Sequence, residues 1–328
     1  MTADRTAIVD SPSGLRCYHH ARYRAYRAEA LAEAKGGIAV SVCLPARNEE
    51  ATVGRIVEVI RTELVQGAGL VDEVVVADDG STDATASVAR QAGATVVPVR
   101  RRPSSGKGVA MAAALAASRG EAVVFVDADV ENFGAYFVVG LLGPLLLAPG
   151  IGFVKGAYGR PLAQAAGEGG RVTELLAKPA LELFHPELAQ FAQPLAGELA
   201  TYRFVIEGLD LRADYGVDVA LLIDVARRIG IGAMAEVDLG ERVHRNRPLA
   251  QLVPQARSVL RAVVARAGSG FSLATCLDAA DHQTGRGVEH NTDPAIDRKR
   301  GSPHPGEGVV RHPPVDEEEE PCQHARRS

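Results

Sequence analysis

Residues 122–129 read AVVFVDAD, a continuous apolar run that ends in two carboxylates. Such a run, without the alternation of a half-exposed strand, is typical of a strand buried on both faces of a parallel sheet. In open α/β sheets, ligands bind outside the carboxyl ends of the strands. The stretch therefore predicts a parallel α/β sheet and the edge at which polar side chains gather.

The segments around this strand alternate between strand and helix patterns. We expect strands at 38–44, 71–77, 94–99 and 122–126, and helices at 22–35, 49–64, 82–92 and 107–118. Farther along, helices are expected at 171–184, 215–229 and 252–267, and strands at 195–203 and 233–239. This alternation predicts a Rossmann-like α/β fold with a mostly parallel central sheet.

The two ends of the chain lack this alternation. Residues 1–20 look irregular. From about residue 281, Pro, Gly, His and charged residues dominate. Such a segment cannot bury enough apolar surface to offset the entropy of ordering, so we expect a disordered tail.

The whole chain has 328 residues and a formal net charge of -5, which gives no indication of a nucleic-acid partner. No apolar run follows a basic start, so no secretion signal is expected. Cys17, Cys43, Cys276 and Cys322 have no C-x-x-C spacing and read as reduced thiols. We therefore expect a cytoplasmic protein.

Residues 137–154 form an uncharged stretch about as long as a short membrane span. Pro144 near its middle and Pro149 near its end are expected to break it into a short buried helix, a turn and the start of a strand. We therefore expect no stable insertion into a membrane.

Asp127 and Asp129 directly follow the apolar strand. Two carboxylates two residues apart can both reach one hard divalent cation, whose other positions take phosphate oxygens. A diphosphate leaving group needs such a cation because negative charge accumulates on its oxygens. The alternative is a solvated loop or a helix cap.

The sequence DDGSTD ends another expected strand. Asp78 and Asp79 are expected to accept hydrogen bonds from a base or a ribose. Asp83 is expected to belong to the turn that caps the following helix, for which Ser81 or Thr82 is the expected N-cap.

Residues 45–50, PARNEE, lie between the first expected strand and its helix. Their backbone amides and polar side chains would surround a ligand at the strand end. Glu50 is alternatively a first-turn acid that the helix dipole favours.

Three other segments suit anions. Residues 104–108 open a helix with glycines, and Lys107 adds a point charge; the spacing of a P-loop is absent, which argues against an ATPase. Residues 169–173 offer backbone amides, an arginine and a hydroxyl, although a flexible linker is the alternative. Residues 242–248 carry three arginines that suit phosphate or carboxylate, while a lone histidine such as His244 is more often structural.

Together these segments resemble the glucosyl-3-phosphoglycerate synthases, retaining glycosyltransferases of the GT-A fold known from actinobacteria. The likeness covers roughly residues 30–252 and is carried by the strings VSVCLPARNEEAT, ADDGSTDAT, GKG, VFVDADV, GPLL, FVKGAYGRPL, GGRVTELLAKP, PEL, QPLAGELA, DYGVDVALLID and VHRNRPL. The first few occur in many GT-A transferases, whereas GGRVTEL, QPLAGE and HRNRPL are far more diagnostic.

The resemblance implies a hexosyltransferase that moves glucose from UDP-glucose to the 2-hydroxyl of D-3-phosphoglycerate with retained configuration. It also implies a Mg²⁺ or Mn²⁺ cofactor and a homodimer. The leaving phosphate itself would accept the proton of the acceptor hydroxyl. We expect four parts in the chain: an N-terminal segment (1–37), a nucleotide-sugar subdomain (38–155), an acceptor subdomain (156–280) and the tail (281–328).

The resemblance further implies a role for each matching position. Asp129 and His244 would bind the metal, and Lys107, Asp129, Asp218 and Arg242 would be catalytic. UDP-glucose would be held by Pro45, Ala46, Arg47, Asn48, Glu49, Asp79, Lys107, Asp127, Ala128, Tyr215, Gly216, Val217, Asp218, Arg242, Val243, His244, Arg245, Asn246 and Arg247. The cradle for 3-phosphoglycerate would be Gly170, Arg171, Val172 and Thr173, with Asn246 nearby.

Three positions depart from the family pattern. The family usually has serine where Ala128 and Asp79 stand, and glutamate where Asp218 stands. Asp218 keeps the charge of glutamate but is one methylene shorter. On the sequence alone, the donor sugar can therefore be either glucose or mannose. Whether Asp218 acts as a base or only positions the sugar is also open.

Four other functions fit parts of the pattern. They are a mannosyl-3-phosphoglycerate synthase that uses GDP-mannose, an inverting transferase that builds a polysaccharide or glycolipid, a sugar nucleotidyltransferase, and a nucleotide-sugar-binding protein without turnover. The nucleotidyltransferases usually carry a Gly-rich loop with an arginine where this chain has PARNEE, which argues against that class.

Overall fold

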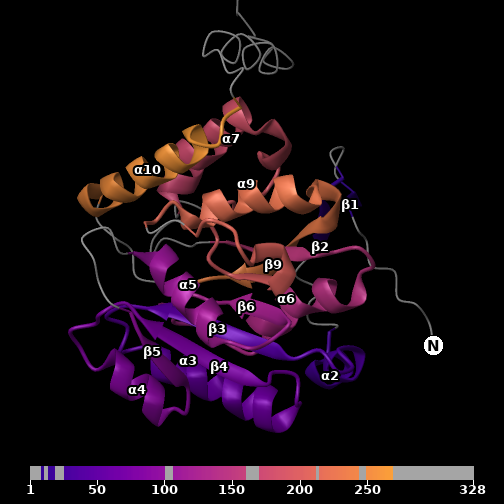
Figure 1. Cartoon of the computed structure of the whole chain (residues 1–328), viewed down its shortest axis with the longest axis vertical. Coiled ribbons are helices and arrows are strands. Elements are labelled where there is room, and N and C mark those ends of the chain that lie inside the picture. The colour runs from indigo at the N-terminus through magenta and orange to yellow at the C-terminus, as the bar shows by residue number, and fades with distance from the viewer. Residues whose placement is uncertain are drawn as a thin grey trace, which may run out of the picture. The chain divides into compact units, whose positions relative to one another are not determined.

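The computed structural model describes residues 9–10, 14–18, 26–99, 106–159, 170–211, 214–243 and 249–268, all within one compact unit (Figure 1). The expected tail over 281–328 lies outside the described residues, as do Cys276 and Cys322. The described residues form a nine-stranded sheet in the order β1-β2-β9-β7-β8-β6-β3-β4-β5. Strands from both expected subdomains thus belong to one sheet.

The elements lie close to their predicted places. The strands are β1 Val9–Asp10, β2 Arg16–Tyr18, β3 Val40–Ala46, β4 Glu73–Asp78, β5 Thr95–Pro98, β6 Ala122–Phe125, β7 Phe153–Gly159, β8 Leu199–Tyr202 and β9 Met234–Glu241. The helices are α2 Ala28–Ala34, α3 Val53–Val59 with its π-helical continuation η1 Ile60–Gly67, α4 Thr85–Gln91, α5 Lys107–Ala117, α6 Tyr136–Leu147, η2 Thr173–Ala177, α7 Lys178–Phe184, η3 Pro186–Leu188, α8 Arg203–Ile206, α9 Val217–Ile229, η4 Ile231–Ala233 and α10 Leu249–Val264.

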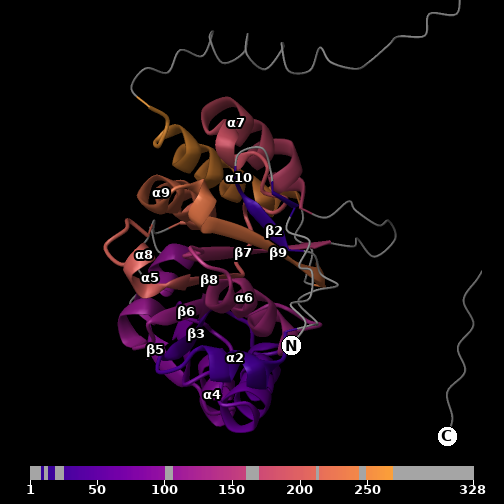
Figure 2. The same ribbon diagram turned by 90° about the vertical axis from the view of Figure 1, so that its right-hand side faces the viewer.

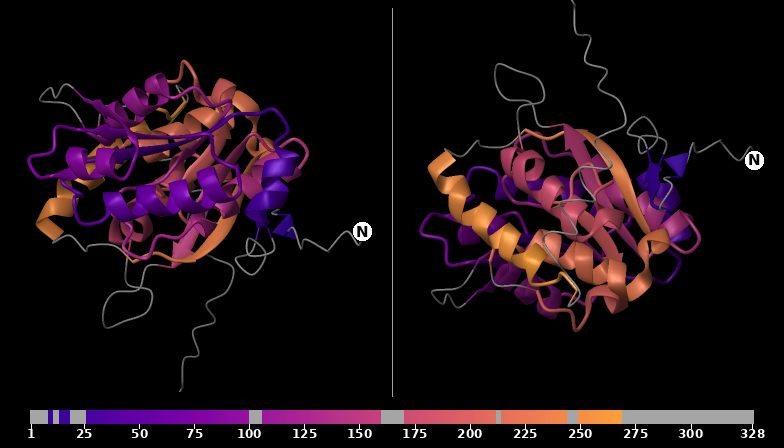
Figure 3. Two further views of the ribbon diagram at one scale, coloured as in Figure 1. Left: turned by 90° about the horizontal axis from the view of Figure 1, so that it is seen from below. Right: turned by 90° about the horizontal axis from the view of Figure 1, so that it is seen from above.

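The sheet is covered on both faces, as continuous apolar strands predict (Figures 2 and 3). Along β3, Val42 and Leu44 pack into one core with residues of α3, η1 and α6. Cys43 points to the other face, into a core with residues of α5, α7, α9 and α10. The alternation follows from the two-residue period of a strand.

The direction of the strands decides where the site lies. Strands β6, β3, β4 and β5 are parallel to one another, and β9 is parallel to β7 and β2. Strand β8 lies between β6 and β7 and is antiparallel to both. The prediction of a mostly parallel sheet is confirmed, and the carboxyl ends of β3, β4, β6, β7 and β9 share one edge with the beginning of β8.

The N-terminal region is more regular than predicted. Within the part expected to be irregular, β1 pairs with β2, and β2 pairs with β9 through Cys17 opposite Glu236. Strands of two and three residues are too short to show a hydrophobic period. They exist because β9 offers a free edge, which local sequence cannot reveal.

The uncharged stretch over 137–154 gives a buried helix, a turn and a strand, as predicted. The break, however, falls at Pro149-Gly150, and α6 continues through Pro144 to Leu147, so the expected break at Pro144 was wrong. Tertiary packing of a helix that is buried from Phe137 to Leu145 outweighs the one donor that proline removes. No helix in the described part of the chain is long and apolar enough to cross a membrane.

Candidate active site

The ends of β3 and β4 lie side by side and bring two predicted segments together. Ala46 is the register partner of Asp78, and the backbone N–H of Asp79 donates to the carbonyl of Ala46 at 2.9 Å. Asp79 is buried. Pro45, Ala46 and Asp79, all expected to hold the nucleotide, therefore lie next to one another.

The loops PARNEE and DDGSTD are bound to each other by hydrogen bonds. Oδ1 of Asn48 accepts the backbone N–H of Thr82 at 2.8 Å, and Oγ of Ser81 accepts the N–H of Asn48 at 2.9 Å. Asn48 has a φ of 55°, a left-handed conformation that asparagine tolerates better than most residues. The N–H of Glu49 donates to Oγ1 of Thr85 at 2.8 Å, while Arg47 is exposed to solvent.

Three predictions about capping have different outcomes. Asp83 accepts the N–H of Thr85, the first residue of α4, at 3.0 Å, so its capping role is confirmed. Ser81 or Thr82 as N-cap was wrong, because α4 begins later and Ala84 stands at that position. Glu50 is not in the first turn of α3, which begins at Val53; its Oε2 accepts the N–H of Ala84 at 2.7 Å and stabilises the start of α4 instead.

Arg242, directly after β9, joins the two aspartates that follow β6. Its Nη2 lies 2.9 Å from Oδ2 of Asp127 and 2.6 Å from Oδ1 of Asp129. The side chain of Arg242 is 5% exposed, against 18% and 25% for the two aspartates. One cationic group thus contacts both carboxylates, which are 115 and 113 residues away from it in the sequence.

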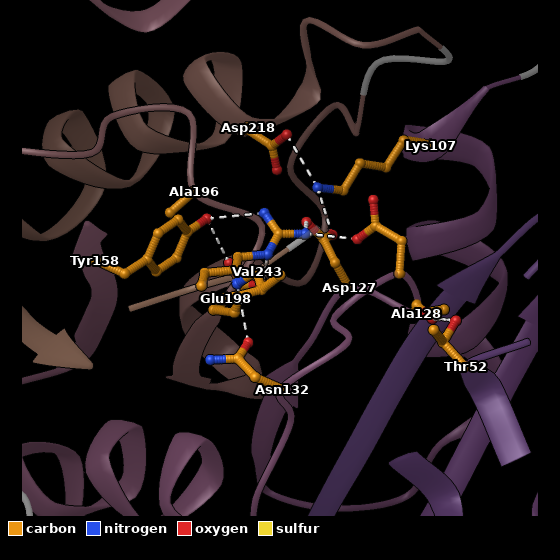
Figure 4. A network of polar contacts seen from close by, with 12 residues as sticks. Thr52, Lys107, Asp127, Ala128, Asn132, Tyr158, Ala196, Glu198, Asp218 and Val243 are labelled. Carbon is orange, nitrogen blue, oxygen red and sulfur yellow. Dashed lines mark hydrogen bonds and ion pairs between the residues drawn. The ribbon is translucent and has the colours of Figure 1, made fainter. Parts of the chain in front are cut away.

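Lys107, the first residue of α5, connects the same cluster to α9. Its Nζ lies 2.8 Å from Oδ1 of Asp127 and 3.1 Å from Oδ2 of Asp218, which stands in the first turn of α9 (Figure 4). Burial alone would lower the pKa of Lys107, but Asp127 and Asp218 outweigh burial and raise it above its usual value. Burial raises the pKa of Asp218, and the charge of Lys107 opposes that rise.

Two residues that the sequence interpretation left without a role complete the cluster. Glu198, just before β8, is fully buried, and its Oε2 accepts the hydroxyl hydrogen of Tyr158 at 2.7 Å. Nη1 of Arg242 donates to the Tyr158 oxygen at 3.1 Å, and Nε of Arg242 lies 3.3 Å from Oε1 of Glu198. Burial raises the pKa of Glu198, and the charge of Arg242 opposes that rise.

Two further charged residues lie on β7 and β9 as register partners. Lys155 is fully buried, its Nζ donates to the carbonyl of Ala196 at 2.8 Å, and burial lowers its pKa to about 8. Glu236 accepts the N–H groups of Ala192 and Gln193 at 3.0 Å each, and burial raises its pKa to about 7. A charged residue inside an apolar run, as in FVKGAY, was the available signal, because buried charges need partners.

Gly197 makes room for the contact between Lys107 and Asp127. A Cβ at this position would overlap Oδ1 of Asp127 and Nζ of Lys107. We expect Gly197→Ala to separate that ion pair, to destabilise the protein by about 1–3 kcal/mol as overpacking does, and to lower turnover at least about tenfold. Gly37→Ala is the matched control, because nothing lies within 4 Å of a Cβ there. Wild-type turnover in Gly197→Ala, measured beside thermal unfolding, would show that the contact is dispensable.

The donor set suits a hard divalent cation. Asp127 and Asp129 present carboxylate oxygens that converge on one point, the position of Arg242 Nη2, and oxygens are the ligands that Mg²⁺ and Mn²⁺ prefer. Among the described residues, no group of three or more His, Cys, Asp or Glu side chains forms a complete metal site.

The predicted second ligand, His244, lies outside the described residues, as do Arg245, Asn246 and Arg247. The preceding residue is bound to the loop after Asp129: the N–H of Val243 donates to Oδ1 of Asn132 at 2.9 Å, and its carbonyl accepts the N–H of Glu131 at 3.0 Å. Metal binding by Asp129 and His244 therefore stays a prediction.

The predicted acceptor cradle forms the start of a helical segment. Gly170 has a φ of 81°, and its carbonyl accepts the N–H of Glu174 at 3.0 Å. Thr173 is buried at the start of η2, which continues into α7, as the helical pattern over 171–184 predicts. Binding of phosphoglycerate by Gly170, Arg171, Val172 and Thr173 stays a prediction.

The predicted sugar segment leads into α9. Tyr215 is 42% exposed, whereas Val217 and Asp218 are buried. The N–H of Gly216 donates to Oδ1 of Asp214 at 2.9 Å, and a Cβ on Gly216 would lie 2.7 Å from the carbonyl oxygen of Ser258 in α10. The close approach of α10 fixes the segment beside Asp218.

A nucleotide-binding type of sheet with paired aspartates and basic side chains at its carboxyl edge is the arrangement of a GT-A glycosyltransferase. Residues 41–136 match the family model described as Glycosyl transferase family 2, in agreement with that class. The chain is therefore a glycosyltransferase.

Comparison with known proteins gives the family within this class. A protein of Mycolicibacterium smegmatis named glucosyl-3-phosphoglycerate synthase is 44% identical over 268 residues, which cover 78% of this chain and 88% of that protein. The structure of glucosyl-3-phosphoglycerate synthase from Mycobacterium tuberculosis with Mn²⁺, UDP-glucose and phosphoglyceric acid is 45% identical, with a TM-score of 0.66 and coverage of 74% of this chain and 86% of that chain. The same enzyme with Mg²⁺ and UDP gives 43% identity, a TM-score of 0.67 and coverage of 76% and 87%. The chain belongs to the glucosyl-3-phosphoglycerate synthase family, and the resemblance inferred from the sequence is confirmed.

Proposed function

We propose that the chain transfers glucose from UDP-glucose to the 2-hydroxyl of D-3-phosphoglycerate with retention of the anomeric configuration, with Mg²⁺ or Mn²⁺ as cofactor. The observation that carries the proposal is the convergence of Arg242 and Lys107 on Asp127, beside Asp129 and Asp218. The ligands in the related structures, namely metal, UDP-glucose and phosphoglyceric acid, support it.

In this mechanism Lys107 and Arg242 donate hydrogen bonds to the departing diphosphate and stabilise its charge in a partly dry site. Asp129 and His244 would hold the divalent cation, which would neutralise part of the same charge. The loops PARNEE and DDGSTD hold the nucleotide, and Gly170 to Thr173 hold the phosphate of the acceptor.

Asp218 positions the sugar. Its Oδ1 is buried and has no hydrogen-bond partner among the described residues, while Oδ2 is fixed by Lys107. A buried acceptor oxygen without a partner is costly unless a ligand satisfies it, and sugar hydroxyls are suitable donors. We assign Asp218 this role rather than that of a base.

The test is an assay of the purified chain with 3-phosphoglycerate and a panel of UDP- and GDP-sugars, with and without divalent metal. We expect metal-dependent release of UDP with UDP-glucose, and an α-linked product by NMR. Preference for GDP-mannose would overturn the donor, release of pyrophosphate would indicate a nucleotidyltransferase, and a β-linked product would indicate inversion.

We also propose that the protein acts in the cytoplasm, which the unpaired thiols of Cys17 and Cys43 in the described part of the chain support. The homodimer stays a prediction that comes from the family alone. Light scattering of the purified chain measures it directly.

A further inference from the structure

The guanidinium of Arg242 is held from two opposite directions. On one side, Nη2 contacts Asp127 and Asp129 at 2.9 and 2.6 Å. On the other side, Nη1 donates to Tyr158 at 3.1 Å, and Nε lies 3.3 Å from Glu198. The contacts on the first side are made to predicted metal-site aspartates, whereas those on the second side belong to the sheet itself.

The side formed by the sheet is the more rigid of the two. Glu198 is fully buried and stands where β8 begins, between β6 and β7. Tyr158 lies near the end of β7, is 4% exposed, and donates its hydroxyl hydrogen to Glu198 at 2.7 Å. Asp127 and Asp129, by contrast, lie in the loop after β6 and are partly exposed. A ligand can therefore replace the contacts to the aspartates without loss of the contacts to Glu198 and Tyr158.

We propose that Glu198 and Tyr158 are positioning residues that hold Arg242 as a built-in counter-ion of Asp127 and Asp129, in competition with the divalent cation. When the cation takes Asp129, Glu198 remains as the anionic partner of Arg242. Nη2 of Arg242 is then available to the diphosphate. This last step rests on the proposed function; the competition for Asp129 does not.

The proposal predicts opposite effects on metal affinity from two neutralising substitutions. Arg242→Met removes the competing cation, so Mn²⁺ alone should bind about tenfold more tightly, because like charges at short range repel. Glu198→Gln keeps the shape of the side chain but removes the anion that compensates Arg242 when the cation occupies Asp129. Mn²⁺ should therefore bind about tenfold more weakly, a loss of affinity similar to that caused by mutating the hydrogen-bond partner of a metal ligand. If either residue had only a structural role, its substitution would lower the unfolding temperature, but the two substitutions would not change the Mn²⁺ affinity in opposite directions.

The measurement is Mn²⁺ binding to the full chain, by electron paramagnetic resonance of the free ion, without nucleotide or acceptor. Arg119→Met and Glu121→Gln are matched controls, because both side chains are exposed around the amino end of β6, opposite to the site. Both should bind Mn²⁺ within about twofold of wild type, since exposed distant charges are screened. Because no sugar donor takes part, the result stands even where the donor assignment fails.

A double substitution separates action through Arg242 from a direct effect. In the Arg242→Met background, Glu198 has lost its cationic partner and, being buried, takes up a proton. Glu198→Gln should then change the Mn²⁺ affinity by less than about twofold.

Tyr158→Phe should lower kcat about tenfold with less change in the KM for UDP-glucose, because it keeps all charges but loosens the guanidinium of Arg242. Unchanged or weaker Mn²⁺ binding by folded Arg242→Met would overturn the proposal. If that variant does not fold, wild-type Mn²⁺ affinity in Glu198→Gln would do the same.

Discussion

Asp129→Asn should lower turnover by about three orders of magnitude while the protein stays folded. Asparagine fills the same volume but presents only a neutral amide oxygen to a divalent cation, and loss of such a ligand removes several kcal/mol of charge stabilisation at the leaving diphosphate. The fold should tolerate the change because the side chain is 25% exposed and Arg242 keeps Asp127 as a partner.

The measurement is kcat at saturating UDP-glucose and 3-phosphoglycerate over a range of Mn²⁺ concentrations, with circular dichroism as a check of the fold. Glu63→Gln, an exposed carboxylate on η1, should behave as wild type. If Asp129→Asn keeps within about tenfold of wild-type turnover at low Mn²⁺, Asp129 is not a metal ligand and the assignment of the site is wrong.

Lys107→Met should damage both stability and turnover. The ammonium group lies between Asp127 and Asp218, and its removal leaves two carboxylates of 18% and 9% exposure without that partner. Loss of one member of a buried ion cluster costs about 3 kcal/mol, reduced here because Asp218 can take up a proton when its pKa rises further. Turnover should fall at least about a hundredfold, because the diphosphate also loses a donor.

The free energy of unfolding in urea and kcat are the two quantities to measure. Lys178→Met is the matched control for stability, because Lys178 makes a surface ion pair with Glu174 at i,i+4 and exposed pairs contribute about 0.5 kcal/mol or less. Equal effects of the two substitutions on unfolding would mean that the buried cluster contributes no more than a surface pair.

The parallel core of the fold and the edge that carries the site were predictable. The short apolar run over residues 122–126 forms the buried strand β6 parallel to β3, and parallel strands end at one edge. Lys107 at the start of a helix and Asp127 after a strand are local signals, and the structure brings them within 2.8 Å of each other.

Other features depend on contacts that no local pattern contains. Strand β2 forms because β9 offers it an edge, and α6 passes through Pro144 because packing holds it. Only the family resemblance connected Arg242 with the aspartates, since 113 residues separate Arg242 from Asp129. Glu198 and Tyr158 had no assigned role, because their importance comes from the guanidinium that they hold.

The reversal of β8 has a consequence for how such an enzyme can diversify. Asp127, Asp129 and Arg242 follow the ends of parallel strands and belong to the loops at the edge of the sheet that carries the site. Strand β8 runs the other way and starts at that edge, so the residue directly before it, Glu198, adds a fully buried carboxylate there. A substitution at Glu198 can therefore change the charge next to Arg242 while the substrate-binding loops stay the same, and those loops can diverge while Glu198 is kept.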